Sequence, residues 1–154
     1  MFNNKIGLEF IWLLITAVVT LLVMLPIYTK LGADYIFLRN NILIIVIAIT
    51  WCRYIFLLKH HWLSSRKWIK VLFIFIPIPI FFFLIGAFYD FQAFSDEKGI
   101  YSIMENITVP EQRKLAKYIR SEILMFWATA FLANAYMPIR MIISLYREIK
   151  SGNH

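Results

Sequence analysis

Long apolar runs dominate the pattern of the chain. Four of them carry no charged side chain apart from Arg53 and Arg140, and they cover residues 10–29, 40–58, 71–89 and 123–146. A helix rises ~1.5 Å per residue, so about 20 residues cross the hydrocarbon core of a membrane. The runs are continuous and do not alternate, which argues against membrane strands. The pattern therefore predicts an all-α integral membrane protein with four transmembrane helices, at about 7–28, 40–58, 71–89 and 123–146.

The 90–120 segment between the third and fourth runs is the one sizeable polar region. It opens with "FSDEKG", which is typical of a turn. Apolar residues then recur at helical spacing, which predicts a short amphipathic helix over Ile100, Ile103, Met104 and Ile107. Thr108 stands three residues before Glu111, as in a capping box, and Pro110 suits a first helical turn. We expect a further helix to begin here and to run directly into the fourth transmembrane helix.

Composition agrees with a membrane protein. Hydrophobic residues make up 61% of the 154 residues, charged residues 16%, and the mean hydropathy is +0.70. A soluble domain of this length cannot bury so many apolar side chains. No internal repeat, low-complexity tract or linker divides the sequence, so we expect a single domain over 1–154. The first run is too long for the apolar region of a signal peptide, which predicts an uncleaved first helix.

Charge is distributed unequally between the two sides of the predicted membrane domain. With four spans, both termini and the loop at residues 59–70 lie on the same side. The formal net charge of +7 falls entirely on this side, whereas the bases and acids of the outer side, Glu122 among them, cancel. Short basic loops stay in the cytoplasm, so we expect both termini to be cytoplasmic, in a plasma (inner) membrane. Anionic lipid head groups are the predicted partners of the candidate lipid-surface residues Lys59, Trp62, Arg66, Lys67, Trp68 and Lys70.

Three charged residues are predicted at similar depth on the cytoplasmic side. At ~1.5 Å per residue, Arg53 lies about 9 Å, Arg140 about 10 Å and Glu9 about 6 Å inside the boundary. An isolated arginine there costs roughly 2–3 kcal/mol, so it should pair, reach the interface or face a polar cavity. In one interpretation the cluster is structural, with Glu9 bridging an arginine or both arginines reaching the interface. In the other it is a pocket for a lipid phosphate or for an acidic group of a partner.

Prolines and small residues indicate how the helices bend and pack. Pro77 and Pro79 lack amide donors and should kink the third helix, either beside a cavity or against neighbouring helices. In the fourth helix, Asn134 lies among alanines that suit close packing and can donate hydrogen bonds across helices. Pro138 should bend the same helix near its end.

The sequence contains no recognisable catalytic or ligand-binding motif. His60 and His61 are adjacent, so on a helix they point about 100° apart and cannot share a metal ion. Cys52 is the single cysteine, and no glycine-rich phosphate loop occurs. We therefore expect no enzyme activity and no cofactor. The basic composition follows from the cytoplasmic charge bias and carries no nucleic-acid motif, so no nucleic-acid partner is expected.

Two functions remain open on the sequence. The expected one is a non-catalytic membrane component, such as a subunit, an assembly factor or a lipid- or partner-binding protein, with a protein partner or a second copy bound. The alternative is an oligomeric channel or small transporter gated around the helix that contains Pro77 and Pro79. Few polar residues occur deep in the runs, which favours the first function.

Overall fold

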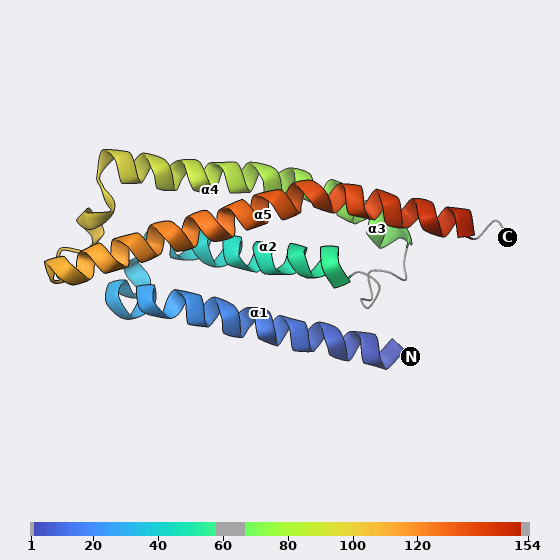
Figure 1. Ribbon diagram of the computed structural model, residues 1–154, viewed down its shortest axis with the longest axis horizontal. Helices are drawn as coiled ribbons and strands as arrows, with labels where there is room; N and C mark the ends of the chain where they lie inside the picture. The colour runs from blue at the N-terminus through green and yellow to red at the C-terminus, as the bar shows by residue number, and fades with distance from the viewer. Residues whose placement is uncertain (1, 58–66, 152–154) are drawn as a thin grey trace.

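The described part of the chain folds into helices. The computed structural model describes residues 2–57 and 67–151, and these residues contain no strand. The helices follow one another as α1 (Phe2–Leu31), η1 (Gly32–Asp34), α2 (Leu38–Leu57), α3 (Lys67–Phe75), α4 (Pro77–Glu97), η4 (Ile100–Ile103) and α5 (Val109–Ser151). They form an elongated bundle with both termini at the same end (Figure 1). We call this the terminal end, and the opposite end, which carries η1 and η4, the loop end.

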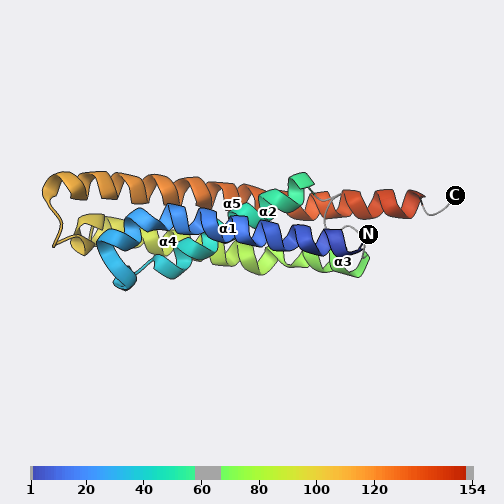
Figure 2. The same ribbon diagram turned by 90° about the horizontal axis from the view of Figure 1, so that it is seen from below.

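Four helical segments in the described residues are long and apolar enough to cross a membrane. They are Gly7–Asp34, Leu38–Leu57, Trp68–Glu97 and Val109–Lys150. Their number and order confirm the four predicted helices, with α3 and α4 together making the third. Figure 2 shows α5 running the full length of the bundle. The polar segment from Val109 and the fourth apolar run therefore form one continuous helix, as predicted.

The end of α4 differs from the prediction. The sequence predicts a turn at "FSDEKG", but the helix continues to Glu97. The amides of Lys98 and Gly99 both donate to the carbonyl of Phe94, at 3.0 and 3.2 Å. Gly99 has φ +75°, a conformation that costs glycine little and that commonly ends a helix. The glycine sets the helix end, so the predicted turn begins too early.

The predicted amphipathic helix after Gly99 is reduced to the short 3₁₀ helix η4. Its apolar residues are nevertheless buried, with Ile100 and Met104 both 1% exposed. The Gln112 side chain donates to the carbonyls of Met104 and Ile107, at 2.8 and 3.0 Å. The segment therefore turns back onto the first turn of α5 instead of extending as a helix. The helical spacing correctly indicates the buried side but overestimates the length.

The bundle packs around α2 and α5, which make the most extensive contact. At the loop end, buried side chains from several helices and η4 form one apolar cluster that includes Ile27, Ile45, Ile100, Met104 and Ile119. Towards the terminal end, a second cluster includes Trp51, Ile55, Met137 and Met141. Between the two, α2, α4 and α5 approach closely through the small residues Ala48, Ala87 and Ala130.

The outer surface of α1 is apolar over most of its length. Phe10, Leu13, Leu14, Leu21 and Leu22 are each at least 64% exposed. A soluble monomer rarely leaves so continuous an apolar face in water. Such a surface suits hydrocarbon, as the predicted membrane location requires.

Candidate functional site

Glu9 and Arg53 form an ion pair between α1 and α2. The Arg53 side chain is 7% exposed and that of Glu9 is 26% exposed. The guanidinium also lies over the ring of Tyr54, with Cζ 4.6 Å from the ring centroid. Both charges stand in the half of the helices nearer the terminal end, as their predicted depth requires. The contact is the one expected if Glu9 holds α1 against α2.

The ion pair lies at a groove between α1 and α2. The groove has a volume of about 500 Å³, and apolar side chains such as Phe10, Leu13 and Val46 form much of its wall. Glu9, Arg53 and Tyr54 supply its charged and aromatic polar groups. Because the two charges are already paired with each other, the groove offers no net charge to a ligand.

Arg140 does not join this pair, which corrects the predicted three-residue cluster. It lies instead at a second groove, of about 590 Å³, between α2 and α5. Cys52 and Phe56 of α2 line this groove, whereas Arg53 lines the first one. Successive residues of a helix point about 100° apart, so similar depth does not bring side chains to the same side of α2.

The guanidinium of Arg140 has an unsatisfied group. Its Nε is buried and has no hydrogen-bond partner among the described residues. The groove beside it is mainly apolar and includes Ile55, Leu132 and Ala133. A buried donor without a partner costs free energy, and a charged donor costs more. The Nε of Arg53 is also buried without a hydrogen-bond partner, but its guanidinium is paired with Glu9. Among the described residues, no such ion pair is found for Arg140.

Lys70 is not available to lipid head groups, which corrects its assignment as a lipid-surface residue. Lys70 is 3% exposed, and its Nζ lies 2.7 Å from Oε2 of Glu148 on α5. An ammonium group this deeply buried requires an ionic partner inside the protein. Trp68, by contrast, is 88% exposed. Lys67 begins α3 but its side chain, like the whole of Lys59, Trp62 and Arg66, lies outside the described residues.

The predicted kink is an interruption between α3 and α4 at Ile76. Pro77 and Pro79 begin α4, where their missing amides remove two hydrogen bonds to the preceding turn. Asn134 of α5, which is 1% exposed, donates through Nδ2 to the carbonyl of Pro77 at 2.9 Å. Its Oδ1 accepts from Nε1 of Trp51 on α2, also at 2.9 Å. The proline-containing turn is thus held by a neighbouring helix.

Pro138 lies inside α5 without ending it. The helix continues to Ser151, because a proline can be accommodated where neighbouring helices pack against the chain. Met137 and Met141, on either side of it, are both fully buried. Pro138 is therefore a residue of the packed bundle.

Sequence reasoning misses a buried polar pair at the loop end. Nδ2 of Asn41 donates to Oε2 of Glu122 at 2.7 Å, and the two residues are 1% and 4% exposed. Tyr35, also 4% exposed, lies close by, and burial raises its pKa well above the usual value. A signal was present, since Glu122 stands three residues after Ile119 and seven after Leu115 on the apolar face of the helix.

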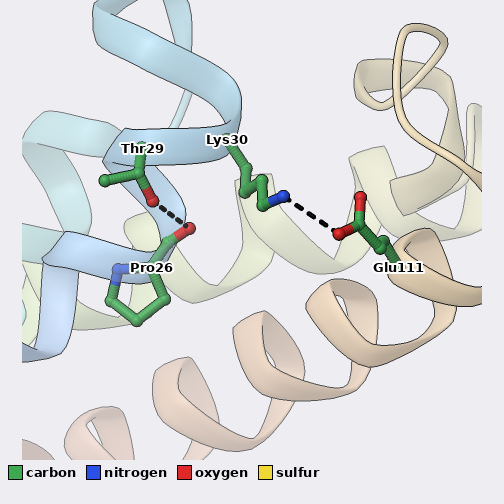
Figure 3. A network of polar contacts seen from close by, with 4 residues as sticks. All are labelled: Pro26, Thr29, Lys30 and Glu111. Carbon is green, nitrogen blue, oxygen red and sulfur yellow. Dashed lines mark hydrogen bonds and ion pairs between the residues drawn. The ribbon is translucent and has the colours of Figure 1, made fainter.

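The loop end of α1 is fastened to α5 by two polar contacts. Nζ of Lys30 lies 3.1 Å from Oε1 of Glu111 (Figure 3), and both side chains are about half exposed. The Tyr118 hydroxyl donates to the carbonyl of Val23 at 2.8 Å. Figure 3 also shows the Thr29 hydroxyl turned back onto the Pro26 carbonyl of its own helix. These contacts hold the loop end of α1 against α5. They add little to the chemistry that a binding site could use.

No group of three or more His, Cys, Asp or Glu side chains that could hold a metal ion occurs in the described residues. The arrangement offers hydrogen bonding, ion pairing and apolar grooves. Comparison of the chain with protein-family models, curated proteins and solved structures finds no match.

Proposed function

We propose that this chain is a non-catalytic membrane component that binds an anionic phospholipid at the groove beside Arg140. Its four apolar helices span the plasma membrane, with the terminal end in the cytoplasm. The phosphate pairs with the Arg140 guanidinium, and an acyl chain lies along the apolar wall between α2 and α5. The observation that carries the proposal is that Arg140, unlike Arg53, has no ion pair among the described residues, and that its Nε is buried without a hydrogen-bond partner.

Charge pairing elsewhere at the terminal end supports this choice of ligand. Glu9 is committed to Arg53, and Glu148 to Lys70. Glu9 and Glu148 are the acidic side chains that the sequence places on this side of the bundle. A phosphate oxygen is a strong acceptor for a guanidinium, and the inner leaflet is the source of anionic lipid.

The polar groups deep in the helices support a non-catalytic role. The hydroxyls of Thr16 and Thr20 donate to carbonyls of their own helix, both at 2.8 Å. The amide of Asn134 is occupied on both sides, by Trp51 and by Pro77. The threonine bonds lie within α1, whereas the bonds of Asn134 link α5 to α2 and to the proline turn. These polar groups already have partners inside the protein.

Co-purification tests the proposal. The wild type, Arg140→Gln and the control Arg147→Gln, whose side chain is exposed, are purified in mild detergent, and bound lipids and proteins are identified by native mass spectrometry. The wild type and the control should retain an anionic phospholipid, and Arg140→Gln should lose it. Equal lipid retention by all three proteins, or retention of a protein partner without lipid, would contradict the assignment.

The alternative of an oligomeric channel rests on the interruption at Ile76. Against it stands the amide of Asn134, which bonds the Pro77 carbonyl and so fixes the turn that a gate would need to move. Ion flux through liposomes containing the purified protein would favour the channel. We expect no flux above that of protein-free liposomes.

A further inference from the structure

Glu122 is a carboxyl group enclosed at the loop end of the bundle. It is 4% exposed, and its one hydrogen bond among the described residues comes from Asn41, which is 1% exposed. Removing a carboxylate from water is costly unless a cation or several donors compensate. In the described residues Glu122 forms no ion pair with a lysine or arginine. A single amide donor is weak compensation for a full negative charge.

The two side chains also leave two acceptors unsatisfied. Oδ1 of Asn41 and Oε1 of Glu122 are both buried and lack hydrogen-bond partners. Each belongs to the same acid–amide pair that is joined through Nδ2 and Oε2. An ionised carboxylate can only accept hydrogen bonds, so it can supply no donor to Oδ1. A protonated one has an O–H to donate.

We propose that Glu122 and Asn41 form a proton-binding site, in which the proton rests on Oε1 of Glu122 and is donated to Oδ1 of Asn41. The amide N–H and the acid O–H then bond in opposite directions across the pair. A single proton gives a hydrogen bond to both unpaired oxygen atoms, Oε1 of Glu122 and Oδ1 of Asn41. It also removes the buried charge. This site is independent of the lipid groove at Arg140, which lies towards the other end of α5.

The groups around the pair agree with a neutral acid. The titratable groups that face Glu122 are Tyr35, from the segment before α2, and Tyr118, one turn earlier on α5. Both are uncharged when protonated, and neither is a counter-charge. The surrounding cluster is otherwise apolar, with Met24 and Ile27 from α1, Phe91 from α4, and Ile100 and Met104 from η4 and the residue after it. Loss of the proton would place an unpaired charge in this cluster.

Glu122→Gln tests the site because glutamine reproduces the protonated pair. Its carbonyl accepts from Asn41 Nδ2, and its own amide donates to Oδ1. The control is Glu105→Gln, which removes the same charge from an exposed position in the loop-end segment. Thermal unfolding of the three proteins in detergent is followed from pH 6 to pH 9. An infrared difference spectrum between these pH values reports the protonated carboxyl stretch directly.

The sign of the expected pH effect follows from proton linkage. The folded state holds a proton that the unfolded chain has lost, so folding binds a proton and stability falls as pH rises. While this difference persists, the midpoint of the wild type and of Glu105→Gln should fall by about 3 °C per pH unit relative to that of Glu122→Gln. The infrared carboxyl band should disappear in Glu122→Gln and remain in Glu105→Gln.

Three results would overturn the proposal. One is that Glu122→Gln fails to fold or melts well below the wild type at pH 6, because the isosteric amide should be tolerated. Another is that wild type and Glu122→Gln share one pH profile. The third is that sodium chloride, but not choline chloride, stabilises the wild type and not Glu122→Gln, which would assign a metal cation to the site.

Discussion

Glu9 at the terminal end and Glu122 at the loop end are both helix carboxyl groups in an apolar bundle, yet they are accommodated in opposite ways. Glu9 is 26% exposed in its side chain and pairs with a guanidinium. Glu122 is 4% exposed and faces an amide. In the first arrangement both side chains stay charged, and each charge is stabilised by the other. The second has no counter-charge among the described residues, which favours the neutral acid that we propose. Two substitutions to glutamine should therefore have very different effects.

The largest effect is expected for Glu9→Gln, which leaves the Arg53 guanidinium buried without its counter-charge. We expect the free energy of unfolding in detergent to fall by about 3 kcal/mol, as for other broken buried pairs. Equilibrium unfolding measures it. Exchange of the two charges, Glu9→Arg with Arg53→Glu, should recover most of the loss. A double variant no more stable than Glu9→Gln alone would refute the structural role of the pair.

A smaller effect is expected for Asn41→Leu. The substitution removes the hydrogen-bond donor to Glu122 and leaves the acid without a hydrogen bond among the described residues. A buried group that loses its partner costs about 2 kcal/mol. At pH 6, Glu122→Gln should stay within about 0.5 kcal/mol of the wild type, because it keeps both hydrogen bonds. The same unfolding measurement compares the two variants with the wild type. Equal losses of stability in Asn41→Leu and Glu122→Gln would show that the acid is not neutral.

Asn134→Leu extends the comparison to a polar residue without charge. It breaks the hydrogen bonds from Trp51 and to Pro77, and such bonds between membrane helices contribute about 1 kcal/mol. The control Asn106→Leu changes an exposed asparagine in the loop-end segment. Hydrogen exchange at Ile76 and the first turn of α4 should increase in Asn134→Leu and not in the control. Unchanged exchange would mean that the asparagine does not hold the proline turn.

The smallest effect is expected for Lys30→Gln. The side chains of Lys30 and Glu111 are both about half exposed, so dissolved salt screens the attraction between their charges. The loss should be below about 0.5 kcal/mol and should vanish at high ionic strength. Unfolding at low and high salt measures it. A loss as large as that of Glu9→Gln would remove the distinction between exposed and buried pairs.

Much of the fold is predictable from sequence because length and continuity of apolar runs are local properties. The helix order and the continuity of α5 follow from them and from the Thr108 and Pro110 signals. The end of α4 is predicted wrongly, because the charged residues before Gly99 resemble a turn although the helix tolerates them.

The site is predicted less well because it depends on direction around a helix. Depth along the membrane places Glu9, Arg53 and Arg140 together, but Glu9 and Arg53 line the groove between α1 and α2, whereas Arg140 lines the groove between α2 and α5. Lys70 resembles an interfacial lysine in sequence, and its burial depends on Glu148, far along the chain. The charge balance counts Glu122 among the acids of the outer side, although its spacing from Ile119 and Leu115 places it on the apolar face of the helix.

Cysteine labelling in cells tests most directly whether the four helices cross the membrane with the terminal end inside. Cys52, the single cysteine, is replaced by alanine, and one cysteine is introduced at the exposed position Glu105 or at the exposed position Arg147. A membrane-impermeant thiol reagent should label Glu105→Cys in intact cells and Arg147→Cys only after the membrane is opened. Labelling of Arg147→Cys in intact cells would contradict the account.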